Sequence, residues 1–352
     1  MLIQIERTRQ KLHDHGSQPA PFEGRRPGLH QALWGGLTNL IFQRPVLAIF
    51  QVCLRCNSSC GYCNLPLNVG RYELSRDEIR QVFTELYKEG VRFVFLQGGE
   101  PLLRRDLVPI LQDLVQLGFH ITLITNGTRL TSNLVEAFNT LKVSLSISLD
   151  TLDPLNYEHI RGADQLDQVL AGLELLEGYR HPKFLTCIVS EVNRQEVAQM
   201  VRFAQERGFL PVVGAYHWDV GLYGKQEPLL MYEREQVRTV FEELLKENVL
   251  PPGYLRQYAK DNVAWLGGKT LKPCDAGRYS IAIDASGHVS PCLSLPEAGN
   301  LLESSLSEIL ARFDRQAIQH CSDRSSCNRL DGRVIGSVLR HPIAAWQTPV
   351  QW

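Results

Sequence analysis

The stretch "VLAIFQVCLRCNSSCGYC" (residues 46–63) joins two patterns that together decide how this chain folds. Its first half is apolar except for Gln51, which is typical of a strand buried on both faces of a parallel sheet. Its second half is a short turn with four of the nine cysteines of the chain. A buried strand that leads directly into clustered thiols predicts a metal or redox site at the end of that strand.

The alternation of apolar runs and amphipathic helical stretches continues far beyond this segment. Several helical stretches open on Ser or Asn and close on Gly, as helix caps do. Six strand–helix units in succession predict an α/β fold with a parallel sheet, and the right-handed crossover rule coils it into a partial (β/α)6 barrel over residues 45–249. The predicted strands are 46–52, 93–97, 121–125, 144–150, 184–190 and 211–219.

Polar signatures follow four of these strands at the point where each one ends. The cysteine turn follows the first strand, "GGEP" (98–101) the second and "NGT" (126–128) the third, while Asp150 ends the fourth. Parallel α/β sheets place their chemistry at the carboxyl ends of the strands. These four signatures are therefore expected to meet on one rim.

The bulk composition excludes several classes of protein. The 352 residues include 37 basic and 38 acidic side chains, so no basic surface for nucleic acid is expected. No apolar run approaches the roughly 18–20 residues of a membrane span, and the first residues lack the layout of a signal peptide. The sequence predicts a cytoplasmic protein, in which clustered cysteines favour metal binding or catalysis over disulfides.

Residues 1–44 form a predicted N-terminal extension with one short amphipathic helix. In "LHQALWGGLTNLIF" (29–42), Leu33, Trp34, Leu37 and Ile41 recur at helical spacing. We expect this stripe to pack against the main domain. Contact of the helix with a membrane surface is the alternative.

The cysteine turn allows two kinds of metal site. Two CxxC pairs, which start at Cys53 and Cys60, could supply the four ligands of a structural zinc ion. However, only three residues separate the pairs, and Cys53 ends an apolar strand, where a free cysteine is often buried. If Cys53 belongs to the core, Cys56, Cys60 and Cys63 remain, and three thiolates suit a four-iron cluster with one open iron.

The segment "CNSSCGYC" (56–63) resembles the signature of the radical S-adenosylmethionine (radical SAM) superfamily. The resemblance covers about residues 46–240. It implies a [4Fe-4S] cluster whose open iron binds S-adenosylmethionine, cleaved to a 5′-deoxyadenosyl radical that removes a hydrogen atom from a substrate. It also implies an electron donor of the flavodoxin or ferredoxin type. The cofactor-binding residues implied by matching motifs are Tyr62, Gly98, Gly99, Glu100, Asn126, Ser148, Asp150 and Arg161.

The roles implied for these residues differ. Glu100 would accept from the cofactor's amino group, and the glycines before it would let the backbone approach closely. Ser148 and Asp150 would hold the ribose hydroxyls. Arg161, in "HIRG", would pair with the methionine carboxylate.

A second cysteine group lies in a predicted small α+β unit over residues 250–335, followed by a tail over 336–352. The segment 279–295 predicts a hairpin, and 304–320 predicts a helix. "CDAGRYSIAIDASGHVSPC" (274–292) resembles the start of the auxiliary cluster domains called SPASM and, when shortened, Twitch. Ile318 and Asp331 stand where two SPASM cysteines would be, so one cluster is expected. Its predicted ligands are Cys274, Cys292, Cys321 and Cys327.

The sequence allows more than one kind of metal group at this second site. Four thiolates could hold one [4Fe-4S] cluster or one zinc ion. Asp331 as an unusual ligand is a further alternative. Cys187, in the middle of the fifth predicted strand, is expected to be a buried apolar residue.

The function expected from these features is a radical SAM enzyme acting in peptide or protein modification, or in cofactor or natural-product maturation. A dehydrogenase or carbon-skeleton enzyme acting on a sugar, nucleotide or lipid is the first alternative. A non-catalytic iron–sulfur or zinc scaffold is the second. At the end of the sixth strand, Tyr216, His217 and Asp219 are candidates for substrate contact or proton transfer.

Overall fold

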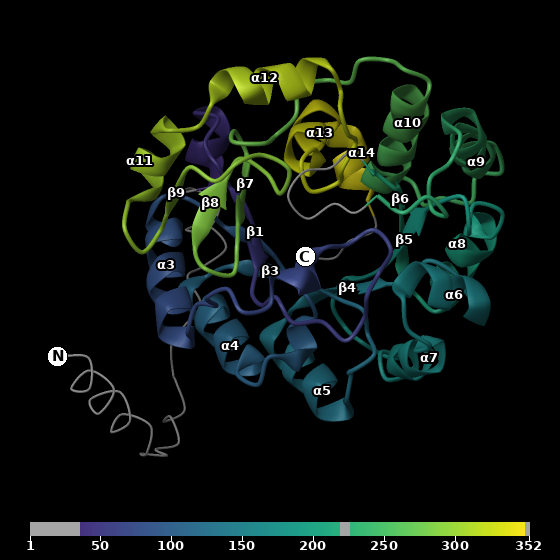
Figure 1. The fold of residues 1–352 in the computed structure, drawn as a ribbon, viewed down its shortest axis with the longest axis horizontal. Helices are drawn as coiled ribbons and strands as arrows, with labels where there is room; N and C mark the ends of the chain where they lie inside the picture. Colours follow the sequence, from purple (N-terminus) through teal and green to yellow (C-terminus); the bar gives the residue numbers. More distant parts are fainter. Residues whose placement is uncertain (1–35, 219–225, 349–352) are drawn as a thin grey trace.

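The computed structural model describes residues 36–218 and 226–348. Their strands form a single curved sheet in the order β6-β5-β4-β3-β2-β1-β7-β8-β9 (Figure 1). The strands are β1 (Leu47–Gln51), β2 (Phe93–Gln97), β3 (His120–Thr125), β4 (Ser144–Ser148), β5 (Lys183–Val189), β6 (Leu210–Ala215), β7 (Ser280–Ile283), β8 (His288–Ser290) and β9 (Gly299–Asn300).

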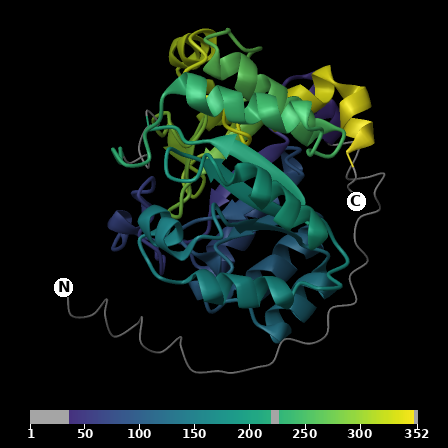
Figure 2. The same ribbon diagram turned by 90° about the vertical axis from the view of Figure 1, so that its right-hand side faces the viewer.

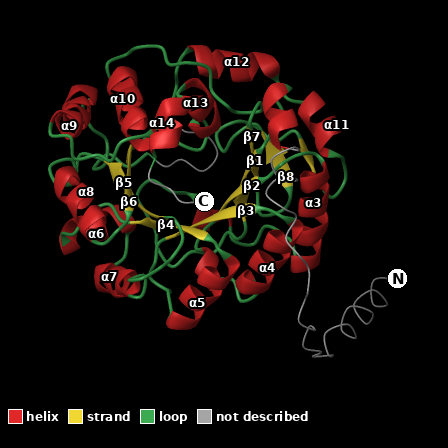
Figure 3. Ribbon diagram, turned by 180° about the vertical axis from the view of Figure 1, so that it is seen from behind, coloured by secondary structure: helices red, strands yellow, loops and turns green. Residues whose placement is uncertain are grey.

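Strands β1 to β6 pair in chain order, and every pair is parallel. Seen from behind, the strands form an arc with helices along its outer side (Figure 3). The predicted partial (β/α)6 barrel is therefore confirmed. The helices are α3 (Arg76–Lys88), α4 (Leu107–Leu117), α5 (Ser132–Leu141), α6 (Pro154–Arg161), α7 (Leu166–Glu174), α8 (Val197–Glu206), α9 (Arg234–Lys246), α10 (Tyr254–Leu266), α11 (Leu306–Ala311), α12 (Arg315–Asp323), α13 (Val334–Arg340) and α14 (Pro342–Gln347).

Local sequence signals set the limits of several helices. Ser75 caps α3 in a capping box with Glu78, in which each side chain accepts from the other residue's backbone N–H. Ser305 and Glu308 repeat this arrangement at α11. At the other end of a helix, Gly118 stops α4 in the left-handed conformation with φ 102°. Each of these signals is local, so it can be read without the fold.

The core lies between the sheet and the outer helices. All five residues of β1 are buried, as expected of a strand covered on both faces. Phe50 on β1 packs edge-on against Phe83 on α3, with ring centroids 5.1 Å apart, and Phe83 continues to Phe119 at 5.3 Å. This packing fixes β1 at the centre of the sheet, and the cysteine turn follows directly from it.

The C-terminal unit continues the barrel sheet. Strand β7 pairs in parallel with β1, and Leu47 lies opposite Ser280. The predicted hairpin forms between β7 and β8, which are antiparallel. In the side view, the yellow C-terminal helices and the green helices lie over the blue and teal barrel (Figure 2). The sequence pattern predicted the hairpin but not its pairing with the first strand.

Two predicted C-terminal segments differ from the structure. The expected single helix over 304–320 is two helices, α11 and α12, because Asp314 accepts from the N–H of Ala317 and starts a new helix. The expected tail contains α14 and most of α13. Thr348, after α14, accepts from the backbone N–H of Tyr254 on α10. The end of the described chain is therefore hydrogen-bonded to the start of α10.

The predicted N-terminal helix lies mainly outside the described residues, including Leu33 and Trp34. Its described part, residues 36–41, is helical. Leu37 and Ile41 are 49% and 67% exposed, so the expected packing of this stripe is wrong at these two positions. Asn39 is the buried residue instead and donates to the carbonyls of Pro45 and Glu89. None of the helices in 36–218 and 226–348 has the length and apolar character needed to cross a membrane.

Candidate functional site

A cavity of about 210 Å³ opens at the carboxyl ends of strands β1 to β4. The cysteine turn, the "GGEP" segment and Asn126 contribute to its wall, so three of the four expected signatures meet at this rim. Ser148 on β4 also lines the cavity, whereas Asp150, the fourth signature, is not among the lining residues. The predicted residues that line it are Cys56, Cys60, Tyr62, Cys63, Gly98, Gly99, Glu100, Asn126, Ser148 and Arg161.

Three of the four clustered cysteines face this cavity. Cys53 instead belongs to the hydrophobic core and is 1% exposed, which confirms the interpretation of this residue. Burial raises the pKa of Cys53 to about 12 and that of Cys56 to about 11. The Cys56 sulfur also accepts from the N–H of Ser58 at 3.4 Å. Backbone donors of this kind stabilise a sulfur that carries negative charge, as a cluster ligand does.

The spacing of the sulfurs tests which metal group the turn fits. The sulfurs of Cys56, Cys60 and Cys63 do not all lie within 4.8 Å of one another. Thiolates bound tetrahedrally at 2.3 Å to one zinc ion would lie about 3.8 Å apart. The spacing of the three sulfurs therefore does not match that of ligands around a single zinc ion.

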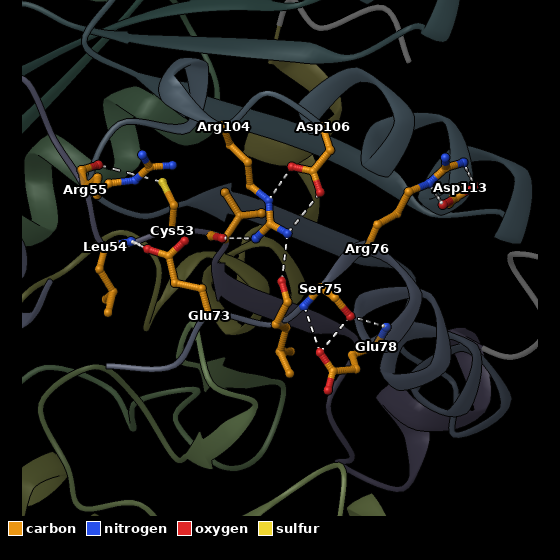
Figure 4. A network of polar contacts seen from close by, with 12 residues as sticks. Cys53, Leu54, Arg55, Glu73, Ser75, Arg76, Glu78, Arg104, Asp106 and Asp113 are labelled. Atoms are coloured by element: carbon orange, nitrogen blue, oxygen red, sulfur yellow. Dashed lines mark hydrogen bonds and ion pairs between the residues drawn. The ribbon is translucent and has the colours of Figure 1, made fainter. Parts of the chain in front are cut away.

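Hydrogen bonds hold the start of the cysteine turn. At its start, Arg104 donates to the carbonyls of Val52 and Leu74, and Glu73 accepts from the N–H of Leu54 (Figure 4). Asp106 holds the Arg104 guanidinium through two contacts of 2.8 and 3.2 Å. These contacts fix the direction in which the chain leaves β1.

The end of α6 holds the middle of the turn. The N–H of Ser59 donates to the Arg161 carbonyl, and the N–H of Gly61 donates to the Ile160 carbonyl. At Gly162, with φ 66°, a Cβ would lie 2.4 Å from the Ser59 carbonyl oxygen. A glycine is required at this contact because both the conformation and the space exclude a side chain.

The two glycines of "GGEP" lie against the cysteine turn itself. The N–H of Gly99 donates to the Cys53 carbonyl, and the N–H of Glu100 donates to the Arg55 carbonyl. A Cβ on Gly99 would lie 2.1 Å from the Arg55 oxygen. The β2 loop thus lies directly against the cysteine turn, and the predicted close approach of these glycines to the cofactor stays a prediction.

Glu100 is held in a fixed orientation beneath the cavity. It is 1% exposed and accepts from the Thr125 hydroxyl at 2.6 Å and from the N–H groups of Asn126 and Leu102. Burial raises the pKa of Glu100, and these donors oppose that rise. Asn126 in turn donates to Asn57 of the cysteine turn at 2.9 Å. Three strand ends are thus joined by one polar network.

Asp150 lies behind the cavity wall, and its side chain is fully buried. One carboxylate oxygen accepts from the N–H of Ile188 on β5 at 2.8 Å. The other contacts Arg161 at 2.7 Å and accepts from the Tyr62 hydroxyl at 3.3 Å. Protein donors contact both oxygens, and the predicted contact of Asp150 with ribose stays a prediction. Ser148, two residues earlier, does line the cavity.

Arg161 is the cation of the cavity. Its side chain is 5% exposed, and the charge of Asp150 raises its pKa against the opposing effect of burial. Its Nε atom is buried and has no hydrogen-bond partner in the described part of the chain. A buried guanidinium with a free donor fits an anionic ligand, such as a carboxylate.

Two of the three candidates at the end of β6, Tyr216 and His217, are not among the residues that line this cavity. Tyr216 is 3% exposed, and its hydroxyl accepts from the N–H of Glu227. His217 accepts from the backbone N–H of Asn328 in the C-terminal unit. Burial and the nearby Arg329 lower the pKa of His217 to about 3. Asp219 lies outside the described residues.

The four auxiliary cysteines come from four separate segments of the C-terminal unit. Burial raises the pKa of Cys274 to about 12 and that of Cys292 to about 11, and it also raises the pKa of Cys327. The charge of the partly exposed Arg329 opposes this rise at Cys292 and Cys327. Cys321 lies on α12. Cations beside buried thiols favour the thiolate form that ligates metals.

The positions where SPASM cysteines would stand have other roles. Asp331 accepts from Arg329 at 2.8 and 3.1 Å and from the N–H of Gly332. Ile318 packs against the hydrophobic core. Neither residue therefore needs a metal to explain its position. Cys187 is also in the core and is 3% exposed, as predicted.

Five residues that line the cavity were not singled out from the sequence, namely Ser58, Pro66, Gln97, Ile124 and Thr125. Ser58 lies inside the cysteine turn, and Gln97 and Thr125 end strands β2 and β3. The positions of Gln97 and Thr125 could have been predicted, because the last residue of a parallel strand reaches the functional rim.

Comparison with known proteins gives the same assignment for both cysteine groups. Residues 50–204 match the radical SAM superfamily, and residues 274–331 match the iron–sulfur cluster-binding domain called SPASM. The AdoMet-dependent heme synthase of Methanosarcina barkeri is 28% identical over 75% of this chain and 82% of its own length. The PqqA peptide cyclase of Rhizobium meliloti is 28% identical over 75% of this chain and 73% of that protein.

A third relative matches over a shorter region. The probable GTP 3′,8-cyclase of Pyrococcus abyssi is 33% identical over 46% of this chain, and the match spans about half of that protein (54%). Among solved structures, Streptococcus suis SuiB bound to its precursor peptide SuiA superposes with a TM-score of 0.63 at 16% identity. That match covers 91% of this chain and 78% of SuiB. The structural likeness shows the shared fold.

The site and the comparisons agree on the cofactors. The radical SAM domain implies a [4Fe-4S] cluster with S-adenosylmethionine, and the SPASM domain implies auxiliary iron–sulfur binding. The zinc alternative for the second site is thereby replaced by an iron–sulfur group. This chain is a radical SAM superfamily enzyme with a C-terminal SPASM domain.

Proposed function

We propose that this enzyme modifies a peptide by abstracting a hydrogen atom from it. The observation that supports this most directly is the cavity itself. It combines three cysteines with the oriented carboxylate of Glu100 and the free donor of Arg161. This donor set suits a cationic sulfonium ligand that carries both an amino group and a carboxylate.

Each residue has a defined task in this proposal. Cys56, Cys60 and Cys63 would hold three irons of the cluster and leave one iron open. Glu100 would accept from the amino group of S-adenosylmethionine, and Arg161 would donate to its carboxylate. Ser148 and Asn126 would contact the nucleoside part, and Tyr62 would close the wall beside Arg161.

When bound, the cluster would supply one electron for cleavage of S-adenosylmethionine to methionine and a 5′-deoxyadenosyl radical. This radical would take a hydrogen atom from the substrate and become 5′-deoxyadenosine. The chain contributes orientation, charge and exclusion of water. A low-potential flavodoxin- or ferredoxin-type protein would supply the electron. We place the enzyme in the cytoplasm, without nucleic acid as a partner.

A second cavity supports a large substrate. It holds about 570 Å³ and lies among Trp218, Met231 and Tyr232, with Glu191, Glu233, Arg234 and Gln236 also in its wall. A row of aromatic rings links it to the cofactor cavity. Ring centroids lie 6.2 Å apart from Tyr62 to Tyr216, 5.7 Å from Tyr216 to Trp218 and 4.9 Å from Trp218 to Tyr232. An open, partly aromatic groove of this kind fits an extended peptide.

A small molecule is the second candidate substrate. The relative named as a heme synthase matches 75% of this chain, as the peptide cyclase does. Cofactor maturation is therefore the alternative reaction. A lipid substrate would draw on the exposed Leu37, Ile41 and Phe42 at the N-terminal helix.

A deuterium-transfer experiment separates these substrate classes. Cells grown in heavy water would supply deuterium-labelled substrates. These would be separated by size into a pool of peptides and a pool of smaller metabolites. The anaerobically reconstituted enzyme would be incubated with each pool, S-adenosylmethionine and dithionite. We expect deuterium in 5′-deoxyadenosine only with the peptide pool. Deuterium from the metabolite pool alone would replace our proposal with the second candidate.

The variant Cys60→Ala provides the control for this experiment. It removes one thiolate of the radical site without touching the second cavity. We expect no 5′-deoxyadenosine above the background of the cluster-free protein. If wild-type enzyme with reconstituted iron also forms none, the non-catalytic scaffold would be the better description.

A further inference from the structure

The end of strand β6 contacts both cysteine regions of the molecule. Tyr216 packs toward Tyr62 of the cysteine turn, with ring centroids 6.2 Å apart. The next residue, His217, contacts the C-terminal unit instead. Consecutive residues of an extended chain point to opposite sides, which explains how one strand end reaches both regions.

Several contacts fix the ring of His217, among them a hydrogen bond with the backbone of Ala215. Its Nε2 atom accepts the backbone N–H of Asn328 at 2.9 Å. Its ring stacks on Trp265 of α10, with centroids 4.6 Å apart and planes inclined by 29°. Because Nε2 accepts a hydrogen bond from the backbone, it is not available there as a proton donor. His217 is also absent from the described lining of both cavities.

Asn328 follows Cys327 directly, so this contact bears on an auxiliary ligand. The loop around it is held by further groups. Trp265 donates from its indole to the Ser325 carbonyl at 2.8 Å, and Tyr258 donates from its hydroxyl to the Asn328 carbonyl at 2.8 Å. Asn328 is fully buried. Its backbone N–H therefore depends on His217 for its partner, since water cannot replace that acceptor without a rearrangement.

We propose that His217 is a positioning residue of the auxiliary cluster, which holds the Cys327 loop at the distance from the barrel that the cluster requires. Tyr258 and Trp265 hold the same loop from α10. His217 connects it to the strand end that also packs on the radical-site turn through Tyr216. The strand end thereby sets how the two cysteine regions lie relative to each other.

The test compares two substitutions of His217 in full-length protein. The background variant Cys56→Ala/Cys60→Ala/Cys63→Ala leaves the auxiliary site as the one cysteine cluster to be loaded. His217→Phe keeps an aromatic ring on Trp265 but removes the acceptor for Asn328. His217→Gln removes the ring but restores an acceptor at about the same reach. Iron per chain and the electron paramagnetic resonance spectrum after reduction would be measured for each.

We expect His217→Phe to lower auxiliary iron at least twofold or to change the spectrum of the reduced cluster. His217→Gln should restore both toward the parent values. His181→Phe, at the other side of the barrel near Asn139, is the matched control and should change neither. Circular dichroism would confirm folding of each variant.

Two results would overturn the proposal. One is full auxiliary iron with an unchanged spectrum in His217→Phe. The other is an equal loss in His217→Phe and His217→Gln, which would assign the effect to ring packing alone. Formation of 5′-deoxyadenosine is measured separately, in protein that keeps all its cysteines, so failure of the peptide proposal would not affect this outcome.

Discussion

The two cysteine regions of this enzyme are built in different ways. The radical site takes its three thiols from eight consecutive residues, and backbone contacts from β2 and α6 hold them. The auxiliary site takes four thiols from residues 274–327, and side chains hold the surrounding loops. A turn that is held by backbone needs glycines beside it. A site assembled from distant segments needs side chains that reach between elements.

The largest expected effect separates the two sites chemically. Replacement of Cys56, Cys60 and Cys63 with Ala should remove all 5′-deoxyadenosine formation, whereas replacement of Cys292 should leave measurable cleavage of S-adenosylmethionine. The reason is that cleavage needs the open iron of the first cluster alone. Product analysis and iron counting check this. Cleavage lost equally in both variants would show that the sites do not act independently.

The next effect concerns the buried ion pair behind the radical site. Asp150→Ala would leave the Arg161 charge buried without its partner and should lower the free energy of unfolding by about 3–5 kcal/mol. Urea unfolding of the cluster-free protein measures this. Asp150→Asn should retain the contact with Ile188, and its free energy of unfolding should fall by less than that of Asp150→Ala.

The surface pair Arg202–Glu247 offers a matched control. Both side chains are about half exposed, and their atoms lie 3.3 Å apart. Glu247→Ala should change stability by less than about 1 kcal/mol. An equal loss for Asp150→Ala and Glu247→Ala would contradict the role that we assign to burial.

A smaller effect tests the backbone contact that holds the turn. Gly99→Ala would place a Cβ 2.1 Å from the Arg55 carbonyl oxygen. We expect this crowding to lower stability by about 1–3 kcal/mol and to reduce iron in the radical site. Gly178→Ala, where a Cβ meets nothing within 4 Å but φ is 74°, controls for backbone strain. Unchanged iron in Gly99→Ala would show that the turn can shift without loss of the cluster.

The smallest expected effect concerns Asp331. Asp331→Asn should leave iron per chain unchanged, because its carboxylate binds Arg329 and the N–H of Gly332 in place of a metal. Iron counting, with Cys292→Ala as the positive control, checks this. Loss of auxiliary iron in Asp331→Asn would make this residue a ligand.

Several features of the site could be predicted because their signals are local. The cysteine turn, the glycines of "GGEP" and Asn126 each follow a strand, and parallel strands bring their carboxyl ends together. The position of Asp150 behind Arg161 could not be predicted. Both oxygens are occupied by groups from β5, α6 and the cysteine turn, and no pattern in the sequence orders those contacts.

The sequence by itself determined the six strand–helix units, the caps of helices such as α3, and the identity of both cysteine groups. All of these depend on residues close together along the chain. The tertiary structure alone decided that β7 pairs with β1, where Ser280 lies opposite Leu47. It also decided that His217 faces the auxiliary loop. Pairing over so long a separation depends on which surfaces remain to be buried after the barrel has formed, and a local pattern does not contain that information.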